Sequence, residues 1–311
     1  MKALWSFRNC KKEEVSRLDL ILPLFSVIQW KKYHPEHTTV IYLDADYMVE
    51  FEKFGLLQFW DEVRILESRT DINKEHFWSI SKIEAIEKES GKIVHVDGDF
   101  ITFCDLTKYG IFDGDIGVTL LEETKDSDNI AYLDSKEAAE FGGIDGDMFE
   151  WDDFADQTSI LYLDNDELKD RFVEDFYKYA KEVSNKKIKH PLGYILFIEQ
   201  KYLRELGKDM GVKKKYLIKD GFKVSNRGIL PNATNGKLGF DEVTQYAYHY
   251  GPGKKMFNSD LSMAVHLGTY IFPVINDREL EAYFWNIYSN KPYVEPNESS
   301  DNVFTKIFKR K

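Results

Sequence analysis

Residues 92–103 read KIVHVDGDFITF, a pattern typical of the centre of an α/β fold. The segment KIVHV has the short apolar run of a buried parallel strand, and it stops at the triplet Asp97-Gly98-Asp99. Ligands of open α/β sheets bind at the edge where such strands end. Residues i and i+2 of a strand face the same side, so Asp97 and Asp99 are expected to converge on one hard cation.

A turn is the plainer interpretation of this triplet, because Asp-Gly pairs are common turn residues. Gly98 also suits ligand binding, since glycine lets the backbone bend and approach a ligand closely. The apolar segment 100–103 follows at once, so the two carboxylates lie between hydrophobic elements. That position favours a ligand site.

The composition bounds the size of the core and the class of partner. The chain has 311 residues, of which 43% are hydrophobic, and this is enough for one large α/β domain. The net charge of −12 argues against binding to a nucleic-acid backbone, which needs a basic surface. Basic residues cluster at 213–215 and 306–311, and the second cluster is expected to make at most a weak contact with an anionic surface.

The cysteines and the apolar runs indicate the compartment. Cys10 and Cys104 fit no metal motif, and both are expected to be reduced. The N-terminus does not read as a signal peptide, and no apolar run approaches the length of a membrane span. We therefore expect a soluble, cytoplasmic protein.

The first hundred residues alternate between strand and helix patterns, which is typical of a mostly parallel sheet flanked by helices. The predicted strands are 2–7, 38–43, 62–66 and 93–96. The predicted helices are 13–33, which Pro23 makes either two shorter helices or one kinked helix, then 47–57 and 77–89.

The alternation loosens in the second half of the chain. The predicted strands there are 115–121 and 160–163, and the predicted helices are 168–183, 194–207 and 277–288. Residues 164–166 read as a helix N-cap. Residues 125–153 are rich in Asp, Glu and Gly, and the second Asp-Gly-Asp within them, at 145–147, is interpreted as a loop turn. Residues 216–236 are expected to be irregular.

An Asp-x-Asp at a strand end, together with a distant histidine followed by Gly and Lys, makes a workable site for a divalent metal bound to a diphosphate. Carboxylates and imidazole supply the O and N ligands that Mn²⁺ or Mg²⁺ accepts. The metal and a lysine would then neutralise the diphosphate as charge develops on it.

Four segments carry a family resemblance: FWSISKIEAI, IVHVDGDFITF, FIEQKYL and AVHLG. They resemble the nucleotide-sugar glycosyltransferases of the GT-A fold, and among them the bacterial and viral capsule-type and mannosyl/galactosyl-type groups. The likeness covers about residues 1–290. It implies one Rossmann-like domain with a nucleotide-binding half at about 1–110, an acceptor half at about 111–290 and a polar, basic tail at 291–311. It also implies a UDP- or GDP-sugar donor and Mn²⁺ or Mg²⁺.

The resemblance assigns roles to the residues around the triplet. Asp97 would contact the ribose, or the metal through water, and Asp99 would bind the metal directly. Lys82 matches a position where such enzymes place a basic group near the nucleotide sugar, although a lysine on an amphipathic helix often faces solvent. Glu199 and Gln200 would line the acceptor side by analogy, or face solvent.

The nucleotide pocket is implied at the ends of the first two strands. Trp5, Ser6 and Phe7 would line the base pocket, and Asp44 would contact the base or the ribose. The alternatives are a core position for Trp5 and a plain strand-ending role for Asp44. His95 lies within its strand and is expected to pack in the core.

The third metal ligand remains open between two histidines. His266 lies in AVHLG, which matches the local pattern, but no lysine follows it. His249 is followed by YGPGKK, in which Lys254 and Lys255 would contact the phosphates. Both histidines therefore stay as candidate ligands.

These inferences predict a metal-dependent hexosyltransferase that moves a sugar from a UDP- or GDP-sugar to a hydroxyl of a glycan, a protein or another acceptor. If the reaction inverts the anomeric centre it needs a carboxylate base, for which Asp152 and Asp153 are candidates by position alone. If it retains, as the resemblance favours, the leaving phosphate takes the proton.

Two alternatives are kept. A nucleotidyltransferase shares the fold and metal but usually carries a Gly-rich loop after its first strand, and WSFRNCKK has no Gly. The other is a non-catalytic protein that binds sugar or nucleotide.

Overall fold

A computed structural model describes residues 1–10, 15–67, 69–124, 132–218, 247–249, 284–287 and 289. The strands are β1 (Lys2–Phe7), β2 (Thr38–Leu43), β3 (Glu62–Ile65), β4 (Ile93–Val96), β5 (Phe100–Thr102), β6 (Ile116–Glu123), β7 (Phe154–Leu163), β8 (Lys214–Ile218) and β9 (Ala247–His249). The α-helices are α1 (Leu18–Tyr33), α2 (Ala45–Lys53), α3 (Ile80–Glu87), α4 (Ser135–Phe141), α5 (Asp166–Ser184), α6 (Pro191–Leu196) and α7 (Leu203–Asp209). The short helices are η1 (Leu57–Phe59), η2 (Leu106–Tyr109) and the π-helix η3 (Phe197–Tyr202).

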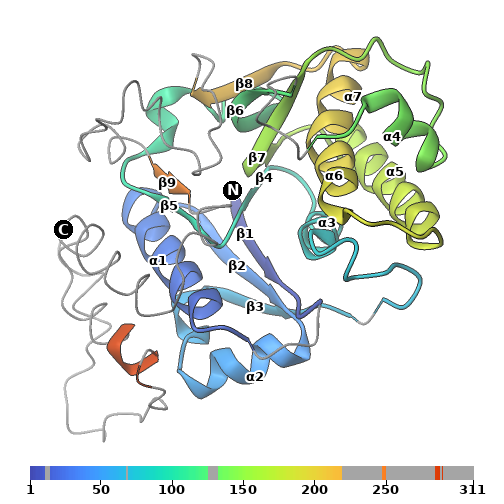
Figure 1. Ribbon diagram of the computed structural model, residues 1–311. Coiled ribbons are helices and arrows are strands. Elements are labelled where there is room, and N and C mark those ends of the chain that lie inside the picture. Colours follow the sequence, from blue (N-terminus) through green and yellow to red (C-terminus); the bar gives the residue numbers. More distant parts are fainter. Residues whose placement is uncertain are drawn as a thin grey trace, which may run out of the picture.

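Seven strands form one mixed sheet in the order β3-β2-β1-β4-β7-β6-β8 (Figure 1). β3, β2, β1 and β4 run parallel, β7 is antiparallel to both β4 and β6, and β8 is parallel to β6. β5 and β9 pair separately as a small antiparallel ribbon. The predicted α/β fold, with a mostly parallel central sheet flanked by helices, is therefore confirmed.

Both faces of the sheet are buried, because helices cover each of them. Successive side chains of a strand point to opposite faces. Ala3 and Trp5 of β1 accordingly join a cluster under α1, whereas Leu4 joins a cluster under α3 and α5. This double burial explains why the strands read as nearly continuous apolar runs.

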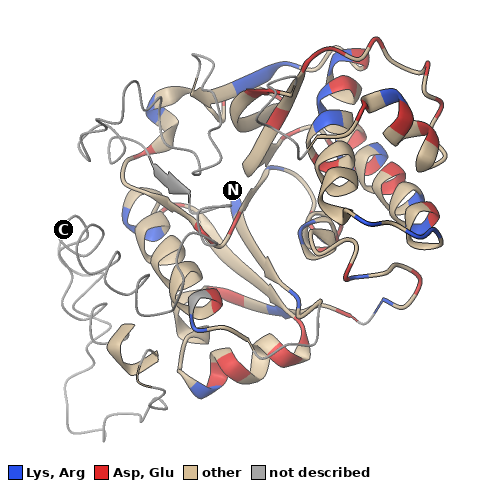
Figure 2. Cartoon of the chain, viewed as in Figure 1, with Lys and Arg blue, Asp and Glu red and all other residues tan. Residues whose placement is uncertain are grey.

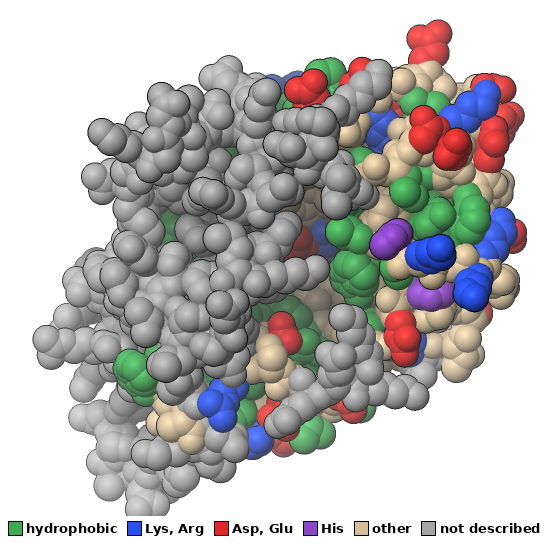
Figure 3. All heavy atoms as spheres, in the orientation of Figure 1, with side chains coloured by type: hydrophobic (Ala, Val, Ile, Leu, Met, Phe, Trp, Pro, Cys, Tyr) green, Lys and Arg blue, Asp and Glu red, His purple; other side chains and the backbone are tan. Residues whose placement is uncertain are grey.

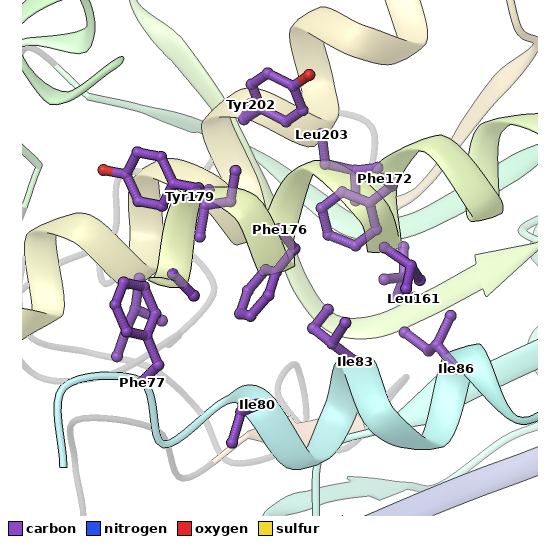
Figure 4. Packing of buried hydrophobic residues seen from close by; sticks show 14 of the residues in the cluster. Phe77, Ile80, Ile83, Ile86, Leu161, Phe172, Phe176, Tyr179, Tyr202 and Leu203 are labelled. Carbon is purple, nitrogen blue, oxygen red and sulfur yellow. The ribbon is translucent and has the colours of Figure 1, made fainter. Parts of the chain in front are cut away.

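The cluster on the α3 face is built largely from aromatic and branched side chains (Figure 4). Phe77 and Ile83 of the α3 region point toward Phe176 of α5, and Leu161 of β7 lies between the two helices. The rings of Phe77 and Phe176 meet edge to face with centroids 6.0 Å apart. All residues of α3 from Ile80 to Ile86 are buried, so this helix lies inside the molecule.

The structure differs from the sequence prediction at several elements. α1 runs from Leu18 to Tyr33 as one helix with Pro23 inside it, so the alternative of two shorter helices is wrong. α4 lies within residues 125–153, where no helix was predicted, and Asp134 caps it by accepting a hydrogen bond from the backbone N of Glu137. Residues 216–218, which were expected to be irregular, belong to β8. β7 is ten residues long, because the polar run 156–159 is buried in the sheet and extends it beyond 160–163.

Charge is spread over the surface. Acidic side chains lie along α2, α4 and α5, with Lys and Arg between them (Figure 2). Acidic, basic and apolar side chains are mixed over the described part of the face in Figure 3. Among the helices that the structure describes, none has the length and apolar character needed to cross a membrane.

Candidate active site

The triplet Asp97-Gly98-Asp99 lies directly after β4, at the carboxyl edge of the sheet, which we define as the edge where β1, β2 and β4 end. The backbone N of Phe100 donates to the O of Asp97 at 2.9 Å, so the triplet is a closed turn and does not continue the strand. The prediction that strand geometry aligns Asp97 and Asp99 is therefore wrong. The turn is fixed to β7, because the N of Asp97 donates to the O of Ser159 at 2.9 Å.

Gly98 is required by close packing at this turn. A Cβ at Gly98 would lie 2.5 Å from Cε1 of Phe7 and 3.1 Å from Cγ of Pro23. Separations this short are not found between real side chains, so a larger residue would have to displace the Phe7 ring. The end of β1 and the middle of α1 therefore hold the turn between them.

Lys82 of α3 reaches Asp97 from inside the protein. Its Nζ donates to Oδ1 of Asp97 at 2.9 Å, to the O of Thr158 at 3.0 Å and to Oε1 of Glu199 over a short contact. An ammonium group has three protons, and three acceptors take them. Burial opposes the charge of Lys82, but the Asp97 and Glu199 carboxylates outweigh it and raise its pKa. Lys82 stays charged and orients Asp97.

This geometry changes two of the predictions. The side chain of Lys82 is 6% exposed, so the alternative of a solvated lysine is wrong. With all three protons used, Lys82 has none left for a diphosphate unless it gives up one of these partners.

Glu199 lies in the π-helix η3, all of whose residues are buried. Its Oε1 also accepts a hydrogen bond from Oγ1 of Thr158 at 2.8 Å. Gln200 follows it and meets the hydroxyl of Tyr132 at 2.6 Å through its Oε1. Neither residue faces solvent, and short π-helical segments occur frequently at functional sites.

His95 and Ser6 lie beside Asp97 on the same face of the sheet. Nε2 of His95 is 2.9 Å from Oγ of Ser6, and its Nδ1 is 3.7 Å from Oδ1 of Asp97. Burial, and then the charge of Lys82, hold the pKa of His95 well below its usual value. His95 is therefore neutral and buried, as expected for a core residue.

Trp5 belongs to the core rather than to a base pocket. It is fully buried, and its Nε1 donates to Oγ of Ser26 at 2.9 Å. Ser26 in turn donates to the O of Phe100 at 2.6 Å, the residue that closes the turn. The predicted contact with a nucleotide base is wrong for Trp5, because no face of the ring reaches the surface. Trp5 supports the turn from within.

Phe7 and Asp44 keep their predicted places near the carboxyl edge. Phe7 is half-buried and packs on Tyr47 and Phe51, with ring centroids 5.5 and 6.0 Å away. Asp44 caps α2: one oxygen accepts from the N of Tyr47 at 3.1 Å and the other from the N of Asn9 at 2.7 Å. Asp44 therefore has at least a structural role.

The residues at the turn suit a hard cation. Asp97 and Asp99 supply two carboxylates, and the side chain of Asp97 is 28% exposed. No third His, Cys, Asp or Glu of the described residues is close enough to both to complete a set of three. Further ligands would have to come from the undescribed part of the chain or from phosphate oxygens.

The C-terminal candidates are only partly described. The backbone of His249 pairs with Phe100 in the β5–β9 ribbon, one residue from Asp99. His266, Lys254 and Lys255 lie outside the described residues, as do the side chain of His249 and the tail 291–311.

No family model matches the sequence, and no curated protein matches it. Solved structures show weak likenesses to this chain. The glycosyltransferase GlyE of Streptococcus pneumoniae TIGR4 is 10% identical with a TM-score of 0.42, over 96% of this chain and 65% of that one. The galactosyltransferase LgtC, solved with donor and acceptor sugar analogues, is 11% identical with a TM-score of 0.38, over 64% and 71%.

A nucleotidyltransferase is similar to the same degree. The inositol-1-phosphate CTP transferase of T. maritima is 11% identical with a TM-score of 0.38, over 71% of this chain and 85% of that one. Likenesses of this size do not indicate an activity.

Sequence reasoning missed two members of the site. Thr158 lies in a polar run that did not read as a strand, and its carbonyl and hydroxyl hold Lys82 and Glu199 together. Arg8 is 8% exposed and forms an ion pair with Glu84 of α3 over a short contact. The sequence did contain a signal for this pair. Arg8 directly follows the predicted strand 2–7, and Glu84 lies in the predicted helix 77–89.

Proposed function

We propose that this protein transfers a hexose from a nucleoside-diphosphate sugar to an acceptor hydroxyl, using a divalent metal at Asp97 and Asp99. The observation that carries the proposal is the Asp97–Phe100 turn at the carboxyl edge. It follows the central strand β4, and β4 and β2 lie on opposite sides of β1, so the strand order reverses between β1 and β4. Ligands of open α/β sheets bind at such switch points.

Asp99 and the exposed oxygen edge of Asp97 would hold the cation, Mn²⁺ or Mg²⁺, with the donor's phosphates as further ligands. When bound, the metal would act as a Lewis acid on the leaving diphosphate. The position of the His249 backbone beside Asp99 supports His249 as an additional ligand, and His266 stays a candidate. Ser6 and Phe7, at the end of β1, remain in the proposal as residues near the nucleotide.

Lys82 would act through Asp97. It fixes the carboxylate that meets the cation, while Glu199 and Thr158 fix Lys82. Because this set is buried and rigid, the site would not need to reorganise when the donor binds. The proposal therefore treats Lys82 as a positioning residue.

The Asp152 side chain is not the base of an inverting reaction in this proposal. Its carboxylate contacts Lys201, Arg204 and Lys208, and these hydrogen bonds hold its pKa far below the usual range against the effect of burial. A carboxylate held this firmly in its ionised form is a poor proton acceptor. We propose retention, with the leaving phosphate taking the proton.

The experiment is calorimetric titration with UDP and with GDP, in the presence and absence of Mn²⁺. We expect one nucleotide to bind only with the metal, and Asp99→Asn to weaken that binding at least about tenfold. Asp145→Asn, in the exposed second Asp-Gly-Asp, is the matched control and should bind like the wild type. Metal-independent binding, or equal binding by Asp99→Asn, would refute the metal role.

A panel of UDP- and GDP-sugars then tests the reaction. Release of the nucleoside diphosphate with the free or transferred sugar supports glycosyl transfer. Release of pyrophosphate from a nucleoside triphosphate in the presence of a sugar phosphate supports nucleotidyl transfer instead. Binding without turnover of any donor supports the non-catalytic alternative.

A further inference from the structure

A second group of ligand-type side chains lies at the amino edge of the sheet, which we define as the edge where β1, β2 and β4 begin. His34, Glu36 and His37 connect α1 to β2, and each can offer one ligand atom so that all three atoms lie within 4.8 Å of one another. Nε2 of His37 is 3.1 Å from Oε1 of Glu36. Asp105 adds a carboxylate, with its Oδ1 3.7 Å from Nδ1 of His34.

Among the residues that the structure describes, two buried imidazole nitrogens at this corner lack hydrogen-bond partners: Nδ1 of His34 and Nδ1 of His37. The side chains of the two histidines are 0% and 4% exposed. Their rings are nearly parallel with centroids 5.0 Å apart, and the Trp30 ring is 4.6 Å from that of His34. An unpartnered buried polar group costs about 1–3 kcal/mol, so the two imidazole nitrogens beside Glu36 and Asp105 point to a missing ligand.

The charge state of the corner suits a cation. Burial lowers the pKa of His34, and burial together with His34 lowers the pKa of His37 to about 4. Both imidazoles are therefore neutral near pH 7, the form that binds metals. Glu36 and Asp105 supply negative charge beside two neutral nitrogens, and such a mixed N and O set suits Zn²⁺, Co²⁺ or Ni²⁺.

We propose that His34, His37 and Glu36, with Asp105, form a binding site for a divalent transition-metal ion. The ion would join the α1–β2 connection to the start of η2, where Asp105 is the N-cap. This site is at the opposite edge of the sheet from Asp97, and it does not depend on the proposed transferase activity.

The hydrogen bond at His34 gives the proposal a specific consequence. The backbone N of Leu106 donates to Nε2 of His34 at 3.3 Å, so without metal the ring proton is on Nδ1. Binding an ion at Nδ1 moves that proton to Nε2 and breaks this long hydrogen bond. Metal bonds of about 2.0–2.1 Å also require the ligand atoms to move closer together. Glu36, whose side chain is 60% exposed, can make that movement.

The test uses the full chain without a histidine tag, in an Asp99→Asn background that weakens the other proposed cation site. Co²⁺ and Zn²⁺ are the probes, followed by visible absorption and by equilibrium dialysis. We expect one ion per chain and at least about a tenfold loss of affinity in both Glu36→Gln and His37→Asn. Glu52→Gln, an exposed change on α2, is the matched control and should bind like the parent.

A second measurement separates the site from chance binding. A Zn²⁺ concentration that just saturates the parent should shift the amide resonance of Leu106 and speed its hydrogen exchange. In Glu36→Gln, which keeps the buried rings, both changes should be smaller and should need about tenfold more Zn²⁺. Equal affinity in the parent and both variants, or an unmoved Leu106 amide at saturation, means an adventitious ion only and overturns the proposal.

Discussion

The two edges of the sheet differ in whether their buried polar groups have all their hydrogen-bond partners. At the carboxyl edge, Lys82 is surrounded by Asp97, Glu199 and Thr158, and every proton of its ammonium group is used. At the amino edge, His34 and His37 are buried as neutral rings with nitrogens that no described residue satisfies. Burying a charged group is tolerated only when all its hydrogen bonds and ion pairs are made. A neutral group can be buried with a missing hydrogen bond at a smaller cost in free energy.

The largest effect is expected at the carboxyl edge. Lys82→Met should lower the free energy of unfolding by about 3–5 kcal/mol, because Asp97 and Glu199 would be left buried without a cation. Urea denaturation measures it. The double variant Lys82→Met, Glu199→Gln should recover part of the loss, and Lys178→Met, which removes an exposed pair with Glu174, should have little effect. An equal loss in the single and double variants would contradict the charge argument.

A steric change at the same edge should have a smaller effect. Gly98→Ala should cost about 1–3 kcal/mol, because the new Cβ overlaps the Phe7 ring. Thermal or urea unfolding provides the measurement. Combining it with Phe7→Leu should make the two changes less than additive, whereas full additivity would show that Phe7 does not set the limit at Gly98.

The corresponding change at the amino edge should have little effect on the free energy of unfolding. His37→Leu, measured by urea denaturation in a chelator, should alter the free energy of unfolding by no more than about 1 kcal/mol, since the ring it removes has an unsatisfied nitrogen. A loss as large as that of Lys82→Met would show that the histidine pair is a closed network too, and the contrast between the edges would fail.

The stability contributed by His37 at the amino edge should depend on pH. The pKa of His37 is about 4 in the folded state, against about 6.5 in an unfolded chain. The unfolded state therefore binds more protons between about pH 6.5 and 4, so stability conferred by the neutral ring is lost as the pH falls through this window. His37→Leu should lose less stability than the wild type between about pH 7 and 5. Equal losses in urea denaturation at both pH values would count against this assignment.

Local patterns predicted the parallel half of the fold well. The strands at 2–7, 38–43 and 93–96 appear with those bounds, and Asn165 caps α5 within the expected 164–166 segment. In each of these the signal is short in range, because apolar runs bury themselves in a covered sheet and a side-chain cap acts within one helical turn.

The features that the sequence analysis did not predict depend on contacts between residues distant in the sequence. The alternative of a solvated Lys82 followed from its amphipathic helix, yet η3, more than a hundred residues later, covers Lys82 and supplies Glu199. The polar run 156–159 did not read as a strand because its burial depends on such partners. The position of the Asp97–Asp99 pair was predicted, but its turn conformation was not, since that is set by Phe7 and Pro23 packing on Gly98.

The π-helix η3 implies a tolerance that ordinary helices lack. A π-turn contains one more residue than the α-helical turn it replaces. Deleting a single residue there would let α6, η3 and α7 merge into one regular rod, with both flanks keeping their own spacing. The cost would be local to Glu199 and Gln200, which could no longer both point into the protein. A one-residue deletion in η3 would therefore remove the buried positions of Glu199 and Gln200 and leave the rest of the fold in place.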